Sequence, residues 1–485
     1  MTLTPLLEPG WVNAILPELI LCAGGMLLIL VEAFSSRSRG ALAPLAVVIF
    51  IAATWSENLV TGGTFFGGTY EISGITRVFD LTFLLAAILT TLFAREYLER
   101  EGIDGGEFYA LLMWGTVGMM MMAKGLDLLI IILGLEILSI CIFVLLGFHR
   151  RLPVANEASL KYFLMGAFAT GFILYGTALF YGATGSTNIK AMGQFFATSS
   201  GANPLLGIAF VLLISGLGFK LALAPFHAWA PDVYQGAPTP VAGWLSTAPK
   251  AATILVMARL LWAMNPVLQN TEWMTMVSAL AVLSMIVGNA VAIVQRDLKR
   301  MLAYSGIAHV GYMMIAMLTV RDESVAAVAV YTIAYALMNI GAFGVISMLA
   351  KNQNDPQTLD DIAGLGFRRP FYGLALAICM FSLSGLPPTA GFISKFYIFK
   401  TAIESGHTSV ALIGILASIV SVYFYLRVVY YLYMKEAADG TAVPVSGVFA
   451  TGALAISLIG ILLIGIFPTP LFNMAGNAAR ELLQQ

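Results

Sequence analysis

Apolar runs about as long as a membrane is thick recur along the whole chain. We count fourteen of them, separated by short polar segments such as SSRSRG, HRRLP and QRDLKR. A helix needs roughly 20 apolar residues to cross the hydrocarbon core of a bilayer. The pattern predicts an all-α membrane protein of about fourteen transmembrane helices, near residues 13–33, 41–58, 75–94, 107–123, 126–147, 153–183, 204–228, 240–264, 273–295, 299–319, 324–350, 371–403, 408–434 and 446–468.

The composition supports a chain that lies almost entirely in the lipid bilayer. Hydrophobic residues make up 59% and charged residues 11% of the 485 residues, whereas about 25% of the residues of a soluble domain are charged. No linker is long or biased enough to divide the chain, so residues 1–485 are predicted to form a single membrane domain. A net charge of −1 gives no indication of a nucleic-acid partner.

Basic residues in the loops predict the orientation of the chain. The loops after odd-numbered spans hold 13 Lys and Arg residues, whereas the other side holds 5, namely Arg77, Lys124, Lys190, Arg321 and Arg480. The positive-inside rule places the richer side, which includes Arg37 and Lys351, in the cytoplasm. Because fourteen is even, both termini are expected on the periplasmic side.

Seven basic residues fall inside the predicted spans, namely Lys161, Lys220, Lys250, Arg259, Lys395, Lys400 and Arg427. Arg259 and Lys400 are near span ends, where a long side chain can reach the interface. Lys220, Lys250 and Lys395 lie deeper. An ammonium is easier to deprotonate once it is removed from water, whereas Arg keeps its proton. We therefore interpret the deep lysines as candidate proton carriers.

A carboxylate also lies deep in the chain. Glu136 is near the middle of the fifth span, and Lys161 lies a few residues after the start of the sixth. The two helices run in opposite directions, so a Glu136–Lys161 pair is geometrically allowed. The pair is either a static buried salt bridge or a switch that loads and unloads a lysine. Because buried ion pairs contribute little to stability, we favour the switch.

Two spans contain helix-breaking residues close to a buried lysine. Pro225 follows Lys220 in GFKLALAPFHAWAP, and a Pro-Pro pair precedes Lys395 in LSGLPPTAGFISK. Prolines remove backbone hydrogen bonds, and broken helices line the ion paths of many transporters. A simple packing kink is the alternative at each site. We predict broken helices at spans seven and twelve.

The two breaks lie five spans apart, which reverses the direction of the chain. This is the pattern of an inverted repeat, with residues 107–264 as the first copy and 273–434 as the second. Lys220 and Lys395 are 175 residues apart, and Glu136 and His309 are 173 apart. His309 is therefore predicted as the counterpart of Glu136 and as a further proton carrier, although a histidine that only packs in the core is the alternative.

The chain shows no signature of a cofactor or metal site. Cys22, Cys141 and Cys379 all lie in apolar runs and form no CxxC pair, so neither an iron–sulfur centre nor a structural zinc is expected. There is no Rossmann or Walker fingerprint for NADH or ATP.

At two places the sequence resembles a known family. The segment GFKLALAPFHAWAPDVYQGAPTPVAGWLSTAPKAA and the segment GLPPTAGFISKF are similar to the two broken-helix signatures of the antiporter-like subunits of respiratory complex I, the bacterial NADH:quinone oxidoreductase. The resemblance covers essentially the whole chain. It implies a proton channel whose functional residues match Glu136, Lys161, Lys220, Lys250 and Lys395 in this sequence.

The resemblance also implies the setting of the protein. It would be a multi-pass subunit of the bacterial inner membrane that assembles with other membrane subunits of the complex. NADH, FMN, iron–sulfur clusters and quinone would be bound by other subunits. The chain would then move protons through its Glu, Lys and His residues while quinone is reduced elsewhere.

Two other functions remain as alternatives. A subunit of a cation/proton antiporter has the same fold, but a sodium site needs clustered oxygens, and we find only Glu136 and Asp80 deep in the spans. A membrane scaffold with no proton path would leave pumping intact when Lys220 is replaced with Ala.

Overall fold

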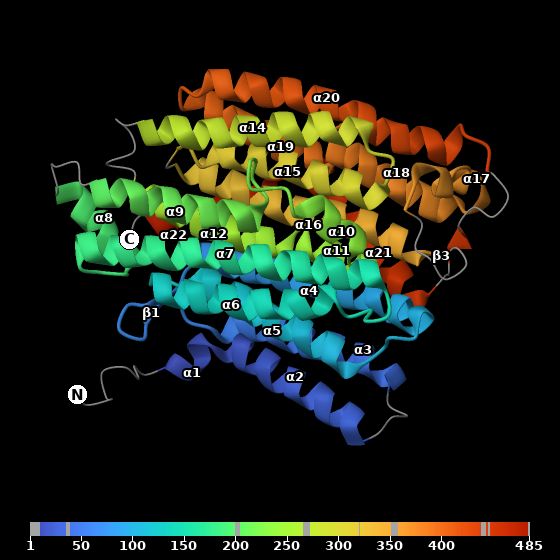
Figure 1. Cartoon of the computed structure of the whole chain (residues 1–485), viewed down its shortest axis with the longest axis horizontal. Coiled ribbons are helices and arrows are strands. Elements are labelled where there is room, and N and C mark those ends of the chain that lie inside the picture. Colours follow the sequence, from blue (N-terminus) through green and yellow to red (C-terminus); the bar gives the residue numbers. More distant parts are fainter. Residues whose placement is uncertain are drawn as a thin grey trace.

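The computed structural model describes residues 10–34, 39–198, 204–264, 272–319, 321–350, 357–437, 443–444 and 447–483. Arg37 and Lys351, which contributed to the predicted orientation, lie outside these ranges. The described chain is a bundle of long helices whose axes run roughly side by side (Figure 1). Apart from the helices it has two short antiparallel pairs, β1 with β2 and β3 with β4.

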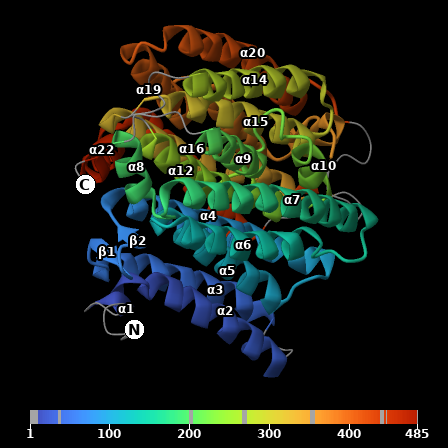
Figure 2. The same ribbon diagram turned by 60° about the vertical axis from the view of Figure 1, so that its left-hand side comes forward.

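The first part of the chain forms one edge of the bundle (Figures 1 and 2). Helix α2 packs against α3 and α5, and α5 packs against α6. The elements are α1 (Trp11–Ala14), α2 (Leu16–Phe34), α3 (Arg39–Ser56), the 3-10 helix η2 (Glu57–Leu59), β1 (Gly63–Phe65), β2 (Tyr70–Ile72), α4 (Gly74–Glu101), α5 (Gly106–Lys124), α6 (Leu128–Leu146) and α7 (Pro153–Thr184).

The middle of the chain supplies the centre of the bundle. Helix α16 contacts α4, α11, α18, α19, α21 and α22. The elements are α8 (Ile189–Thr198), α9 (Pro204–Leu221), α10 (Ala230–Gly236), α11 (Thr239–Leu245), α12 (Ala248–Ala263), α14 (Glu272–Val294), α15 (Leu298–Ala316), α16 (Asp322–Met348) and β3 (Leu349–Ala350).

The last part of the chain covers the opposite edge, where α20 is the outermost helix in both views (Figures 1 and 2). Helices α21 and α22 return to pack against α4 and α16. The elements are η3 (Leu359–Ile362), α17 (Leu365–Arg368), α18 (Pro370–Ser384), α19 (Ala390–Glu404), α20 (Thr408–Tyr433), β4 (Val443–Pro444), α21 (Val448–Ile466) and α22 (Thr469–Leu483).

Eleven helical segments of the described chain are long and apolar enough to cross a membrane. They coincide with eleven of the fourteen predicted spans. The other three predicted spans correspond to α5, α15 and the pair α18–α19, which do not meet the same criteria of length and hydropathy. Helices α18 and α19 have 15 residues each, because five intervening residues interrupt the predicted long span.

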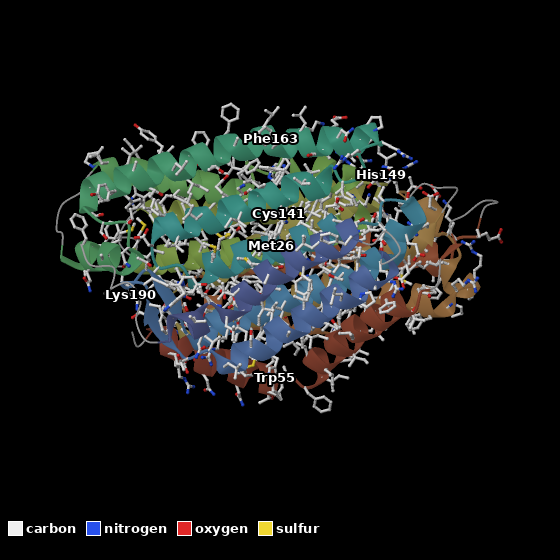
Figure 3. All side chains as sticks on the ribbon, turned by 90° about the horizontal axis from the view of Figure 1, so that it is seen from below. Met26, Trp55, Cys141, His149, Phe163 and Lys190 are labelled. Atoms are coloured by element: carbon white, nitrogen blue, oxygen red, sulfur yellow. The ribbon has the colours of Figure 1, made fainter. Side chains whose placement is uncertain are left out.

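The outer surface of the bundle is apolar. Phe163 and Trp55 project from opposite sides in Figure 3, and both are well exposed, as is Met26. Lys190 and His149 lie near opposite ends of the helices in the same view. Apolar lateral faces between polar ends are what a lipid bilayer requires of its proteins. By contrast, residues 239–261 are all buried inside the bundle.

Helices α6 and α15 begin in the same way. Asp127 and Asp297 are their N-caps, and each side chain accepts a hydrogen bond from a backbone N–H of the first turn. Each aspartate also bridges a later strand-like segment, Asp127 with Asn188 and Asp297 with Thr358. Asp127 and Asp297 are 170 residues apart in the chain, and so are Asn188 and Thr358. Both helices have 19 residues.

Candidate functional site

Lys220 lies in the last turn of α9, one residue before the helix ends. Leu223 N donates to Gly218 O and Ala222 N donates to Phe219 O, while Ala222 has a φ of 58°. This is the Schellman pattern that ends a helix. The Lys220 side chain is buried, donates to Ser139 Oγ on α6 at 2.8 Å, and lies 5.7 Å from the Tyr162 ring.

Glu136 and Lys161 do not form the predicted pair in this structure. Glu136 is half-buried on α6 and accepts a hydrogen bond from Thr170 Oγ1 at 2.7 Å. The side chain of Lys161 is 42% exposed and pairs with Glu157 at 2.7 Å and Asp232 at 3.0 Å. The prediction rested on depth along each helix, whereas the rotation of α7 about its axis turns Lys161 toward the surface.

Asp232 on α10 connects two distant helices. It accepts from Lys161 on α7 and, at 2.6 Å, from Arg300 Nη1 on α15. Partial burial raises the pKa of this carboxyl, but the hydrogen bonds and positive charges of Arg300 and Lys161 prevail and hold its pKa below the usual value. Asp232 therefore stays ionised near neutral pH and ties α7 to α15.

Lys250, in the first turn of α12, is 1% exposed, and its Nζ has no hydrogen-bond partner among the described residues. It lies 5.7 Å from the Tyr234 ring. A methyl group on Gly306 would be 3.0 Å from Lys250 Nζ and 2.9 Å from Tyr335 Oη. The absence of a side chain at Gly306 thus leaves room for both polar groups.

His309 on α15 is fully enclosed and contacts a hydroxyl on each side. Its Nε2 is 3.0 Å from Tyr425 Oη, and its Nδ1 is 2.8 Å from Tyr331 Oη. The Tyr335 ring lies against it, with centroids 4.9 Å apart. A neutral imidazole donates from one nitrogen and accepts at the other, so His309 can pass a proton between two hydroxyls.

The starts of α6 and α15 give a different spacing from the one that paired Glu136 with His309. The 170-residue offset between the starts of α6 and α15 aligns Glu136 with Gly306, and His309 with Ser139. The two spacings differ by three residues, which is about one helical turn, and the pairing of Glu136 with His309 stays a prediction. The sequence comparison used the distance between two lysines, and those lysines occupy different positions relative to their helix breaks.

Lys395 follows the second interruption. Helix α18 ends as α9 does, with Leu386 N donating to Phe381 O and Gly385 at a φ of 87°. Lys395 Nζ reaches back from α19 to the carbonyls of Leu383 and Ser384 at 2.9 and 3.1 Å, and to Ser418 Oγ at 2.9 Å. It is buried and lies 5.2 Å from the Tyr312 ring.

Aromatic residues connect these groups into one continuous region. Tyr335 lies between Lys250 and His309, and Tyr312 lies between His309 and Lys395. On the other side, the rings of Tyr162, Trp229 and Tyr234 lie in sequence between Lys220 and Lys250. Three predicted lysines and His309 are therefore brought together, with Glu136 one helical turn from Ser139, while Lys161 lies apart.

Several of these residues could not be recognised from the sequence. Tyrosine is common in apolar helices, so Tyr312, Tyr331 and Tyr425 gave no signal. Arg259 was expected to reach the interface, but it is 4% exposed and pairs with Glu71 at 3.2 Å. Lys124, assigned to a loop, is fully buried at the end of α5 among three carboxylates.

Metal ligands are not clustered in the part of the chain that the structure describes, where no group of three or more His, Cys, Asp or Glu residues is arranged to hold an ion. Cys22, Cys141 and Cys379 are free thiols.

Comparison with known proteins gives a consistent result. Residues 125–421 match the family described as NADH:quinone oxidoreductase/Mrp antiporter, TM. A protein of Trichlorobacter lovleyi named NADH-quinone oxidoreductase subunit N is 42% identical over 96% of this chain and 97% of its own length. A protein of Rhizobium meliloti named NADH-quinone oxidoreductase subunit N 2 is 38% identical over 99% of each.

Solved structures agree with the sequence relatives. A chain of respiratory complex I from Thermus thermophilus superposes with a TM-score of 0.81 at 34% identity, over 95% of this chain and 99% of that one. A chain of the Mrp complex from Dietzia sp. has a TM-score of 0.83 at 18% identity, over 98% of both chains, which shows a shared fold. With relatives of this similarity along nearly its full length, the chain belongs to the NADH-quinone oxidoreductase subunit N family of antiporter-like membrane proteins.

Proposed function

We propose that this protein is a proton-translocating membrane subunit of a bacterial NADH:quinone oxidoreductase. Relatives that are named as subunit N of that enzyme are similar to this chain over nearly their whole length. The protein would work in the inner membrane within a complex of membrane subunits. Lys395 agrees with this assignment, because a Lys rather than a Glu at this position fits subunit N better than subunit M.

The observation that carries this proposal is that three buried lysines, Lys220, Lys250 and Lys395, form no ion pair with any described residue. In the described chain no carboxylate lies within ion-pair distance of Lys220, Lys250 or Lys395. Lys220 donates to a hydroxyl, and Lys395 donates to two carbonyls and a hydroxyl. Lys250 has no hydrogen-bond partner among the described residues. A lysine that only stabilised the fold would be expected to have an anionic partner. Burial without a counter-charge makes the neutral form accessible, as a proton carrier requires.

The order of groups along the proposed path follows from which groups are in contact. A proton on Lys220 would move toward Lys250 past Tyr162, Trp229 and Tyr234. From Lys250, Tyr335 and His309 lead to Tyr425 and Tyr331, and Tyr312 leads to Lys395. Glu136 would set the charge near Lys220 from the neighbouring turn of α6. Lys161 would act from the surface through Asp232 rather than by direct pairing with Glu136.

We extend the proposal to the architecture of the membrane domain. All fourteen predicted segments would cross the bilayer, with α5, α15 and α18–α19 as the three added to the eleven apolar helices. Residues 107–264 and 273–434 would be inverted copies. The paired Asp127 and Asp297 bridges support this, since α8, which follows the first, and α17, which follows the second, lie at opposite ends of the bundle (Figure 1).

The proposal includes the orientation of the chain in the membrane. Helices α1 and α22 lie at the same end of the bundle (Figures 1 and 2), and Glu481 on α22 accepts from Gly74 N at the start of α4. We propose that this end faces the periplasm, because most loop Lys and Arg residues are at the other end.

The redox chemistry would take place on other subunits. NADH, FMN, iron–sulfur clusters and quinone would bind there. In this chain the groups of the relay would only accept, hold and release protons, so its part in the enzyme is translocation.

Substituting Lys220 with Arg tests the carrier role directly. Arg keeps a positive charge but does not release its proton. In inverted membrane vesicles driven by NADH, Lys220→Arg should lower proton uptake about as much as Lys220→Ala, by roughly 100-fold if transfer through this residue is obligatory. Lys400→Ala is the matched control, because Lys400 is about half exposed and pairs with Glu404 at 3.8 Å. Normal pumping by an assembled Lys220→Arg complex would contradict the proposal.

A further inference from the structure

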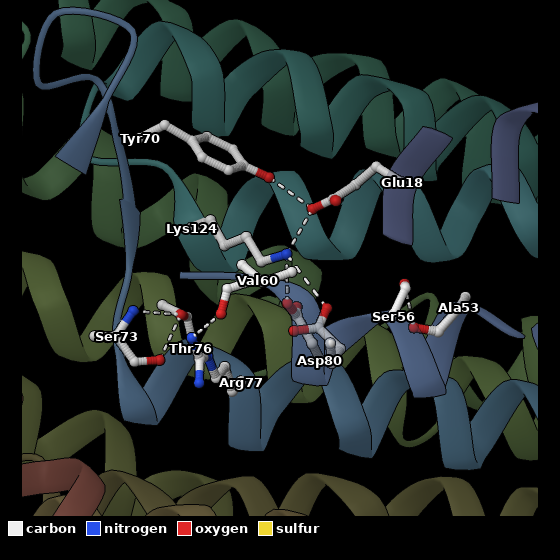
Figure 4. Close-up of polar contacts among 11 residues, drawn as sticks. Glu18, Ala53, Ser56, Val60, Tyr70, Ser73, Thr76, Arg77, Asp80 and Lys124 are labelled. Carbon is white, nitrogen blue, oxygen red and sulfur yellow. Dashed lines mark hydrogen bonds and ion pairs between the residues drawn. The ribbon is translucent and has the colours of Figure 1, made fainter. Parts of the chain in front are cut away.

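A second group of buried charges lies outside the proposed relay. Lys124, at the end of α5, meets a carboxylate from each of three other elements (Figure 4). Its Nζ is 2.7 Å from Glu18 Oε1 on α2, 2.7 Å from Asp80 Oδ2 on α4 and 3.5 Å from Glu57 Oε1 on η2. Tyr70 on β2 donates to Glu18 Oε1 at 2.7 Å. We call these five residues the Lys124 cluster.

The three carboxylates are not equally satisfied. Glu18 Oε1 accepts hydrogen bonds from both Lys124 and Tyr70, as expected of an ionised carboxylate. Glu57 is 4% exposed, and neither of its oxygens accepts a hydrogen bond from any described residue. Asp80 is fully buried and contacts Lys124 through one oxygen. One ammonium balances one carboxylate, so two negative charges would remain uncompensated if all three acids were ionised.

We propose that the Lys124 cluster is a proton-binding site, in which Glu57 and Asp80 hold one exchangeable proton between them. Two carboxylates that share a buried site cannot both be ionised without a large cost. A proton on one of them also supplies an O–H donor for the oxygens that have no partner. A bound proton therefore removes one of the excess negative charges and supplies a hydrogen-bond donor to the two acids.

The geometry favours a proton over a metal ion. The centre of the cluster, where a cation would contact Glu18, Glu57 and Asp80 together, is occupied by the ammonium of Lys124. The described residues contain no group of acids arranged to hold a metal. A proton needs no coordination shell, so it fits between two oxygens where a hydrated or partly hydrated ion does not.

This site is independent of the proposed proton path. None of its members contacts Lys220, Lys250, His309 or Lys395. A link between the two is Arg259, which pairs with Glu71 of β2, next to Tyr70. Arg259 lies on α12, the helix that has Lys250 in its first turn. A failure of the cluster to bind a proton would therefore leave the assignment of the lysines unchanged.

Infrared spectroscopy of the purified complex tests this proposal. A protonated carboxyl has a C=O band that a carboxylate lacks, and this band shifts in D₂O when the proton exchanges. The spectrum of the wild type minus that of Glu57→Gln should contain one such band at neutral pH, and Asp80→Asn should remove the same band. Glu404→Gln is the control, because Glu404 is also paired with a lysine but is about half exposed.

Each outcome of this experiment decides the question. A band that shifts in D₂O and disappears in either amide variant supports the proposal. The proposal would be overturned if the band were absent from both difference spectra, or if it did not shift in D₂O. Loss of the band when Na⁺ replaces K⁺ would also overturn it. Failure of both amide variants to assemble would also overturn it, because the proposal requires that a neutral side chain suits this place.

The pH dependence of stability gives a second test. A folded state that holds a proton which the unfolded state releases is stabilised less as pH rises. The thermal midpoint of the complex should fall with rising pH, and Glu57→Gln should reduce this slope, whereas Glu404→Gln should not. An unchanged slope in Glu57→Gln would contradict the site. The charged and titratable groups that face Glu57 and Asp80 or their partners are Glu18, Cys22, Tyr70, Glu71, Arg77, Lys124 and Arg259.

Discussion

Replacing Lys250 with Met should leave stability unchanged or higher and at the same time strongly reduce proton transfer. Met has a similar length and keeps the apolar stem, while it removes an ammonium that has no hydrogen-bond partner among the described residues. A charged lysine at the centre of a membrane helix costs about 2.5–3.5 kcal/mol on insertion scales. Because no partner would be left unpaired, Lys250→Met should recover a part of this cost.

The assay measures both effects on the same preparation. The thermal midpoint of the assembled complex should be unchanged or higher in Lys250→Met, while NADH-driven proton uptake in inverted vesicles should fall by roughly 100-fold, the scale of a lost proton-transfer group. Quinone-linked turnover should fall with it, since a coupled machine stops when its proton path is blocked. Lys400→Met, at a half-exposed position, serves as the control for both readings.

Two results would refute this reasoning. Normal proton uptake in an assembled Lys250→Met complex would remove Lys250 from the path. A strong decrease of the thermal midpoint would mean that the ammonium is held by groups that stabilise it, so that its role is structural.

Three further substitutions test other parts of the site. Glu136→Gln should impair proton uptake and turnover together, and unchanged values of both would exclude a role for this charge near Lys220. His309→Phe keeps the ring but loses both contacts to hydroxyls, so proton uptake should fall by at least about tenfold with assembly intact on a native gel. Asp232→Asn should weaken the tie between α7 and α15. The partners of Asp232 lower its pKa, so the stability that it contributes is present above its unfolded pKa and is lost as pH falls. The thermal midpoint of the wild type should therefore exceed that of Asp232→Asn at pH 7, and the two midpoints should converge toward pH of about 3.

The sequence predicted the helices well because hydropathy follows directly from the surrounding lipid. It also located the three deep lysines, since a basic residue within a long apolar run has few structural reasons to be there. Helices α9 and α18 end close to the Pro and Gly residues on which the predicted breaks were based, and broken transmembrane helices at these places stay a prediction. The fourteen crossings themselves stay a prediction, as eleven helices meet the criteria.

Contacts between helices could not be predicted in the same way. The Glu136–Lys161 pair was inferred from depth alone, but which face of α7 bears Lys161 depends on how the bundle packs. The Lys124 cluster combines residues from five elements, between residues 18 and 124 of the chain. A signal for it did exist, because Glu18 in ILPELIL and Asp80 in VFDLTF are acids in apolar runs, and each needed a basic partner.

The surface position of Asp232 has a consequence for experiments on intact membranes. Its partners Lys161 and Arg300 are partly exposed, so dissolved ions reach all three charges, whereas Lys220, Lys250 and Lys395 are enclosed. Salt screens exposed charges over about 8 Å at physiological ionic strength and over about 3 Å at 1 M. Ionic strength therefore acts on the connection between α7 and α15, as it does on other exposed ion pairs such as Lys435–Asp360. It weakens that connection without any mutation and leaves the three enclosed lysines unscreened.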